Sequence, residues 1–147
     1  MKENVDMKTI NLIASMLLMS GTAAFAQTGN PVGHWQLDNG TLTVKIVKCD
    51  GDKICGKISA LEHTLNPDGT EKLDFRNPNT AMRSRHIIGS PVFSGMEPSG
   101  ENQWKGTIYS ADDGGTYRAY ATLSGNKMDV KGCWGPFCKN LNFKRVK

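Results

Sequence analysis

The sequence predicts an all-β protein, a single up-and-down antiparallel barrel of about eight strands. Three observations support this fold. Apolar and polar residues alternate with a period of two through most of the chain after residue 33, and no stretch there has the spacing of an amphipathic helix. Turn signals rich in glycine, asparagine and aspartate interrupt the alternation at short intervals. Successive hairpins favour a barrel closed between its first and last strands, whereas a two-sheet sandwich, the alternative, usually needs long crossing connections.

Residues 1–26 are expected to be a secretory signal that is removed before the barrel folds. An apolar run over residues 10–20 is followed by an A-x-A cleavage pattern at residues 24–26. The run is shorter than the roughly 20 residues that cross a bilayer, so we expect no membrane span. The translation start is either Met1 or Met7, because acidic residues before Met7 are unusual in a signal.

The rest of the chain is expected to be a short lead, residues 27–32, and one barrel domain, residues 33–147. A chain of 147 residues is too short for a two-domain enzyme. The net charge is +4 and basic residues are interspersed with acidic ones, so no nucleic-acid-binding stripe is present. No cysteine follows the signal until Cys49, which leaves no lipid attachment point. We therefore expect a location in the periplasm.

The four cysteines predict two local disulfides. Cys49 and Cys55 enclose five residues, and Cys133 and Cys138 enclose four. Four cysteines allow three pairings. Local pairs close the shortest loops and each stabilises by roughly 2 kcal/mol in the chain-entropy model. Structural zinc is the competing interpretation, but its sites use C-x2–4-C spacings and are commoner in reducing compartments. We expect no metal and no cofactor.

The turns define the predicted strands and their register. Asn39-Gly40 is a preferred two-residue hairpin turn and pairs Trp35 with Val44. Direct opposition of Cys49 and Cys55 sets Val44 opposite Ala60. The predicted strands cover residues 33–38, 41–49, 54–62, 86–96, 101–112, 115–124, 127–133 and 138–146.

Three features set the register of the C-terminal half: turns at Asp113-Gly114 and Gly125-Asn126, and the closure by Cys133 and Cys138. Each brings apolar residues opposite apolar residues, so the separate turns agree on one inward face. The predicted pairs are Ile108 with Ala119, Leu123 with Met128, and Met128 with Phe143.

The inward face combines large and small side chains, and two interpretations remain open. Gly106, Ala119 and Ala121 can fit the taper of a filled barrel, or they can leave a cavity for one small ligand. In the second case the cavity walls are the large inward residues Trp104, Tyr117, Met128 and Phe143.

Residues 63–85 have no clear strand pattern, and such long connections are often functional loops or lids. Asp74, Arg83 and Arg85 can line the barrel mouth and hold a polar or anionic group of a ligand. Alternatively, Asp74 caps a turn or pairs with one of the two arginines and pins the loop across one end of the barrel. We favour the second interpretation.

Trp134 and Phe137 lie in the loop that the second disulfide closes. In the predicted register Trp134 falls opposite Tyr117, so we expect it to fold inward and plug one end of the barrel. If it points outward, the rigid apolar tip suits a partner or a membrane surface.

Gly33-His34-Trp35 and Lys144-Arg145 resemble the lipocalin signature, in which the tryptophan of the first strand packs against an arginine from the last strand. Arg145 shares the inward face with Trp35, so a cation-π contact between them is expected. The tight Asn39-Gly40 turn departs from true lipocalins, whose first hairpin loop is long.

A more extensive resemblance covers nearly all of the chain after residue 33. The chain resembles the uncharacterised bacterial family catalogued as domain of unknown function 2147 (DUF2147). This resemblance implies a secreted or periplasmic protein with a lipocalin-like barrel and no established activity. The motifs that carry it include Cys55-Gly56-Lys57-Ile58, Asn77-Pro78, Ile88-Gly89, Trp104-Lys105-Gly106-Thr107-Ile108-Tyr109 and Gly132-Cys133.

We therefore expect a periplasmic, lipocalin-like protein that binds a small, partly apolar molecule. The alternative is a packed barrel that acts as an envelope interaction or stress module through its surface. An enzyme is not expected, because no nucleophile, metallohydrolase or phosphate-binding motif is present. The three histidines also lack the sequence spacing of a metal site.

Overall fold

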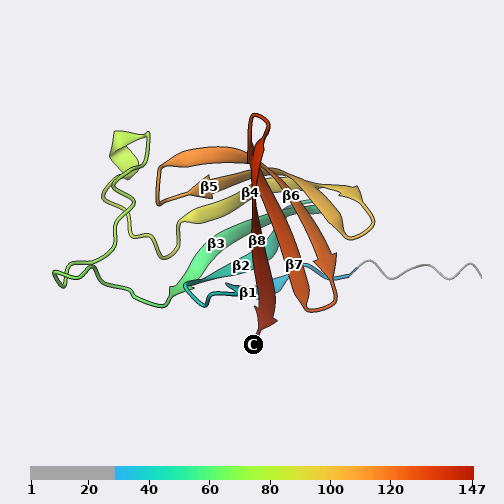
Figure 1. Cartoon of the computed structure of the whole chain (residues 1–147), viewed down its shortest axis with the longest axis horizontal. Helices are drawn as coiled ribbons and strands as arrows, with labels where there is room; N and C mark the ends of the chain where they lie inside the picture. The colour runs from blue at the N-terminus through green and yellow to red at the C-terminus, as the bar shows by residue number, and fades with distance from the viewer. Residues whose placement is uncertain (1–28) are drawn as a thin grey trace, which may run out of the picture.

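The computed structural model describes residues 29–147, which form a closed barrel of eight antiparallel strands (Figure 1). The strands follow one another around the barrel in chain order and the first pairs with the last, so the predicted up-and-down topology is confirmed. The strands are β1 (Gly33–Leu37), β2 (Leu42–Asp50), β3 (Lys53–Leu61), β4 (Pro91–Gly100), β5 (Gln103–Ser110), β6 (Gly115–Ser124), β7 (Lys127–Trp134) and β8 (Phe137–Val146).

Residues 1–26, the expected signal, lie outside the described residues. In the described part of the chain, no helix has the length and apolar character needed to cross a membrane.

Both predicted disulfides are present, Cys49 with Cys55 and Cys133 with Cys138. Cys133 and Cys138 lie directly opposite each other on β7 and β8. The rest of the C-terminal register also agrees with the prediction, since Met128 pairs with both Leu123 and Phe143.

The predicted register between β2 and β3 is wrong by two residues. Val44 pairs with Ile58 instead of Ala60, and Cys49 lies in an irregularity between Lys48 and Asp50 instead of opposite Cys55. A second irregularity next to Val44 turns Ala60 outward, where it is exposed. A disulfide can therefore close this hairpin without direct opposition of its two cysteines.

The register between β5 and β6 is also displaced by two residues. Ile108 pairs with Tyr117 instead of Ala119, because the turn contains the four residues 111–114 instead of only Asp113-Gly114. A displacement by two keeps each side chain on its predicted face, so Ile108 and Ala119 are still buried.

β4 begins at Pro91, later than the predicted 86–96 segment, and it contributes core residues that the sequence pattern did not identify. Val92, Phe93 and Met96 are buried in the barrel interior. Met96 and Phe93 occupy the space beside the small residues: a Cβ on Gly106 would lie 3.0 Å from the Met96 Cα, and one on Gly56 would lie 2.6 Å from the Phe93 Cδ2. At these two positions, the small residues accommodate large neighbours instead of leaving a cavity.

Candidate functional site

One end of the barrel is sealed around Trp35, which is fully buried. The indole Nε1 donates to the carbonyl of Pro31 at 2.8 Å, and the Arg145 guanidinium lies 4.3 Å from the centre of the indole ring. Arg145 also donates to the carbonyls of Val32, at 2.8 Å, and Asn30. The segment before β1 is therefore tied across this end by the tryptophan and arginine of the lipocalin-like signature.

The opposite end, where the β1–β2 and β5–β6 turns lie, has a ring of apolar side chains that are only partly buried. We call this set the mouth ring. Its members pack against the fully buried core from five strands and from the segment before β4. The mouth ring consists of Leu37, Leu42, Leu61, Ile87, Tyr117 and Leu141.

Of the four predicted cavity walls, only Tyr117 belongs to the mouth ring. Trp104, Met128 and Phe143 are buried within the packed core. The Tyr117 hydroxyl donates to the Asp113 carboxylate at 2.6 Å. This hydrogen bond is the main cause of a raised pKa at Tyr117 and a lowered pKa at Asp113. Tyr117 thus presents a polar group at the edge of an otherwise apolar ring.

Residues 62–90 connect β3 to β4 and run out from the barrel on the left in Figure 1. The connection contains one short 3-10 helix, η1 (Thr80–Met82), and two isolated β-bridges. Its path crosses the β5–β6 turn, where a Cβ on Gly114 would overlap the Arg76 carbonyl. The loop is thus held against the mouth end of the barrel.

A polar cluster around Asp74 attaches this loop to β5, and we call it the latch. Asp74 is fully buried. Its Oδ2 accepts from Arg85 Nε at 2.9 Å, from Arg85 Nη2 at 2.6 Å and from Asn77 Nδ2 at 2.8 Å. Its Oδ1 accepts from the Tyr109 hydroxyl at 2.6 Å. The carboxylate is thus surrounded by donors from the loop and from the barrel wall.

The electrostatics of the latch favour a charged Asp74. Burial acts to raise the pKa of Asp74, but the hydrogen bonds from Tyr109, Asn77 and Arg85 outweigh it and hold the pKa below its ordinary value. Burial and the bond to Asp74 raise the pKa of Tyr109. Since Asp74 and Arg85 satisfy each other, neither is free to hold a ligand while the latch is closed.

Arg83 does not contact Asp74. Its Nε donates to the carbonyl of Asn77 at 2.8 Å, and the residue is exposed. Tyr109 is the latch member that sequence reasoning missed. It lies 35 residues from Asp74 on the outward face of β5, and no local motif links the two.

The inward orientation predicted for Trp134 is wrong. Trp134 and Phe137 pair with each other at the end of the β7–β8 hairpin, and each is 72% exposed. The β6–β7 ladder ends at the pair of Arg118 with Cys133, so Trp134 lies beyond the last paired position. On its β6 side, Trp134 therefore has no paired strand to cover it.

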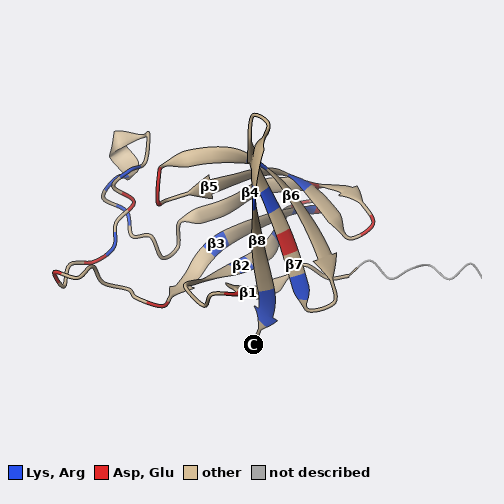
Figure 2. Cartoon of the chain, viewed as in Figure 1, with Lys and Arg blue, Asp and Glu red and all other residues tan. Residues whose placement is uncertain are grey.

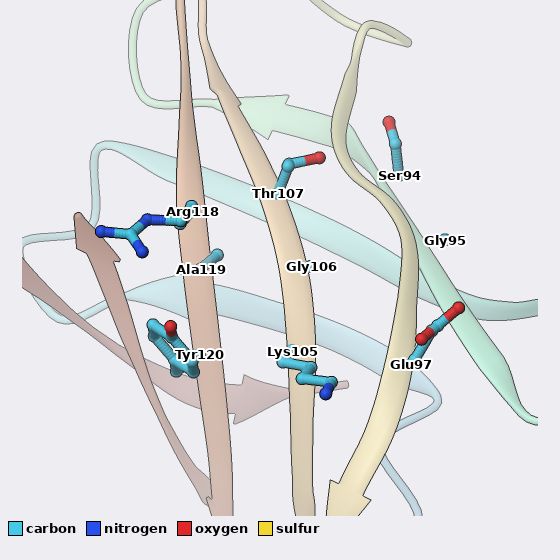
Figure 3. A pocket seen from close by; sticks show the side chains of 9 residues that line it. All are labelled: Ser94, Gly95, Glu97, Lys105, Gly106, Thr107, Arg118, Ala119 and Tyr120. Atoms are coloured by element: carbon cyan, nitrogen blue, oxygen red, sulfur yellow. The ribbon is translucent and has the colours of Figure 1, made fainter. Parts of the chain in front are cut away.

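A shallow hollow of about 400 Å³ lies on the outer wall over β4, β5 and β6 (Figure 3). Lys105, Arg118 and Glu97 line it together with the aromatic ring of Tyr120. A bulge with Gly95 at φ +60° separates β4 from β5 beside it. The hollow is on the other side of the wall from the core, so a ligand in it would not enter the barrel. Among residues 29–147, no group of three His, Cys, Asp or Glu side chains is arranged to hold a metal ion.

The family model described as "Uncharacterized protein conserved in bacteria (DUF2147)" matches residues 33–145. Among solved structures, the chain is similar to protein HP1028 from the human pathogen Helicobacter pylori, described as belonging to the lipocalin family. The TM-score is 0.67 at 24% sequence identity, with 82% of this chain and 85% of the other covered. This likeness shows a shared fold. No curated protein matches the chain significantly.

Proposed function

We propose that this chain, which belongs to the bacterial family DUF2147, binds a small, partly apolar molecule at the open end of its lipocalin-like barrel, in the periplasm. The mouth ring is the observation that carries the proposal. Six apolar side chains converge on one end of the barrel without being fully covered. Partly exposed apolar surface that converges in this way is typical of a binding site.

The packed core limits the size and position of the ligand. Trp104, Met128 and Phe143 occupy the interior, so the ligand would rest on the mouth ring instead of filling the barrel. Leucine and isoleucine side chains would take its apolar part. The Tyr117 hydroxyl and the Asp113 carboxylate, at the rim, would take a polar group that can donate a hydrogen bond.

The 62–90 loop would cover the bound molecule. It carries further exposed apolar side chains, and its attachment to β5 depends on the latch. Release of the latch would free Arg85 to meet a polar group of the ligand, and Arg83 lies exposed on the same loop. The exposed large apolar residues of the loop are Leu65, Phe75, Met82 and Ile88.

A periplasmic location is supported by the two disulfides, which form and persist in oxidising compartments. The apolar run and A-x-A pattern at the N-terminus of the sequence support export.

Binding can be tested with protein purified from the periplasm of its own host. Native mass spectrometry should detect a retained small molecule. Titration with the apolar probe N-phenyl-1-naphthylamine should show saturable fluorescence, and Leu61→Ser in the mouth ring should weaken probe binding about tenfold, because it removes one apolar contact. Val47→Ser is the matched control, since Val47 is exposed on β2 outside the ring. Absence of both retained ligand and saturable probe binding would contradict the proposal.

A further inference from the structure

The tip of the β7–β8 hairpin is the most exposed aromatic feature of the described chain. We define the tip as residues 132–138, which stand out beyond the rest of the barrel at the top of Figure 1. Trp134 and Phe137 are each 72% exposed, more than any other large apolar residue in residues 29–147. Exposed apolar surface of this kind is unfavourable in water and indicates a contact surface.

The tip is rigid, so its aromatic side chains cannot escape water by folding back. Trp134 and Phe137 are a cross-strand pair joined by a two-residue turn, in which Gly135 has φ +56°. The Cys133–Cys138 disulfide closes the hairpin directly behind them. Arg118 of β6 braces the turn by donating to the Gly135 carbonyl at 3.2 Å. A preformed hairpin of this kind loses little conformational entropy when it binds.

The charged residues nearest the tip along its own two strands, and the side chain that braces it from β6, are all basic. Residues 132–138 contain no charged side chain, and the first charged residues on the two strands behind it are Lys131 and Lys139. Arg118 on the adjacent strand is a third cation. Figure 2 shows the tip uncoloured, with a basic position below it on β7. The next acid along β7, Asp129, lies beyond Lys131.

The β5–β6 turn at the same end of the barrel carries two acids, Asp112 and Asp113, and among the described residues neither forms an ion pair with these cations. Both oxygens of Asp113 are engaged, Oδ1 by the backbone N–H of Gly115 at 2.8 Å and Oδ2 by the Tyr117 hydroxyl at 2.6 Å. The tip therefore combines an uncharged aromatic end with a basic collar of Lys131, Lys139 and Arg118.

We propose that the tip inserts into the interfacial region of an anionic lipid bilayer. Tryptophan favours the headgroup level, where its apolar ring and its polar N–H are both satisfied, and a phenylalanine beside it adds apolar area that inserts below the headgroups. The three basic side chains have the length to reach lipid phosphates while their stems stay against apolar surface. Each cation near an anionic surface strengthens binding about fivefold. A protein partner fits less well, because the exposed aromatic surface is small and protrudes from the barrel (Figure 1), and the nearest charged residues on its own strands are both basic.

Tryptophan fluorescence tests this inference selectively. The chain has three tryptophans, and Trp35 and Trp104 are 0% and 7% exposed, so Trp134 alone can report a change at the surface. Mixing the mature protein with vesicles of phosphatidylethanolamine and phosphatidylglycerol should shift the emission to the blue and protect it from acrylamide. Vesicles of phosphatidylcholine alone should give a much smaller shift, and added salt should reduce the effect.

Variants separate the aromatic and basic parts of the tip. In vesicle sedimentation, Phe137→Ser should weaken binding at least tenfold, and Lys131→Gln with Lys139→Gln should remove most of the preference for anionic vesicles. Phe75→Ser, at an exposed aromatic on the 62–90 loop, is the matched control and should bind as wild type does. These are surface positions, and the absence of free thiols verifies that the disulfides have formed.

Three outcomes would overturn the inference: no blue shift with anionic vesicles, an equal shift with both kinds of vesicle, or an equal loss of binding in Phe75→Ser. The result is independent of ligand binding at the mouth, because the assay uses no barrel ligand and measures a different set of residues.

Discussion

The two ends of the barrel use their aromatic and charged residues differently. At the sealed end, Arg145 lies on the face of a fully buried Trp35 and holds the incoming chain by backbone carbonyls. At the mouth end, Arg85 engages a buried carboxylate, Asp74, and holds a long loop against the outside of β5. The first arrangement is part of the core, and the second is attached to its surface.

This difference indicates which end of the barrel contributes most to the free energy of unfolding and which end can open locally. Loss of a sealed-end contact opens the core itself, whereas loss of the latch frees the middle of the 62–90 loop, whose ends stay joined to the barrel by Ile87 and by the backbone hydrogen bonds of Gly89 and Ser90 with Ile58. The mouth end can therefore open while the rest of the barrel stays folded, as local unfolding requires. Substitutions at the two ends provide direct tests of this interpretation.

The largest effect is expected at Trp35. Trp35→Ala removes a fully buried aromatic side chain, the platform for Arg145 and the donor to Pro31, and should lower the free energy of unfolding by about 3–5 kcal/mol. Urea unfolding followed by circular dichroism measures the change. Tyr117→Ala is the control at the mouth and should cost much less, because that ring is only partly buried. Similar losses in the free energy of unfolding for Trp35→Ala and Tyr117→Ala would contradict the proposed difference between the two ends of the barrel.

A smaller and more local effect is expected at the latch. Asp74→Ala leaves the Tyr109 hydroxyl and the Arg85 guanidinium without their acceptor, and should destabilise the loop attachment by about 2–4 kcal/mol. Limited proteolysis should then cut within residues 62–90 while the barrel persists. Asp74→Asn keeps an oxygen that accepts from Tyr109, so its susceptibility to proteolysis should lie between that of the wild type and that of Asp74→Ala. Cooperative unfolding of the whole barrel in Asp74→Ala would show that the latch belongs to the core.

The latch should also open with acid. Because the pKa of Asp74 is lower in the folded protein than in the unfolded chain, its contribution is present above the unfolded value of about 3.9 and is lost as pH falls through the lowered folded value. Protection of the amides of residues 62–90 against hydrogen exchange, relative to their intrinsic rates, should therefore fall below about pH 4. Asp68 and Asp113 also have lowered pKa values, so Asp74→Asn is the control that isolates the latch. An unchanged acid transition in that variant would assign the effect to the other two carboxyls.

The alternation of apolar and polar residues was sufficient to predict the barrel and most of its inward face. Successive side chains of a strand alternate between its two faces, so a register error of two residues leaves every side chain on the same face. The errors in the β2–β3 and β5–β6 registers therefore left Ile58, Ile108 and Ala119 inside. The bulge that exposes Ala60 changes parity within a strand, and nothing in the local sequence marks it. Likewise, Asp113-Gly114 suggested a two-residue turn between β5 and β6, but the structure has a four-residue turn over 111–114, and the sequence alone does not distinguish the two.

The candidate site was less predictable, because its contacts join distant segments. The sequence indicated that Asp74 pairs with an arginine, but Tyr109 is an outward residue of β5 whose role depends on the loop folding back over it. Trp134 shows a different limit. Parity gives the face of a strand to which a side chain belongs, whereas burial also requires a neighbouring strand, and the β6–β7 ladder ends one residue before Trp134.

The smallest expected effect comes from a pair of leucines that lie at the two ends of the barrel and differ in burial. Leu141→Ala in the mouth ring removes partly buried surface and should lower the free energy of unfolding by about 1 kcal/mol. Leu123→Ala removes a fully buried side chain near the sealed end and should cost about 2–5 kcal/mol. Only Leu141→Ala should also weaken binding of the apolar probe, because only that side chain is available to a ligand. If Leu123→Ala weakened the probe more, the site would lie in the core, and the small residues there would then mark an opening that the static packing conceals.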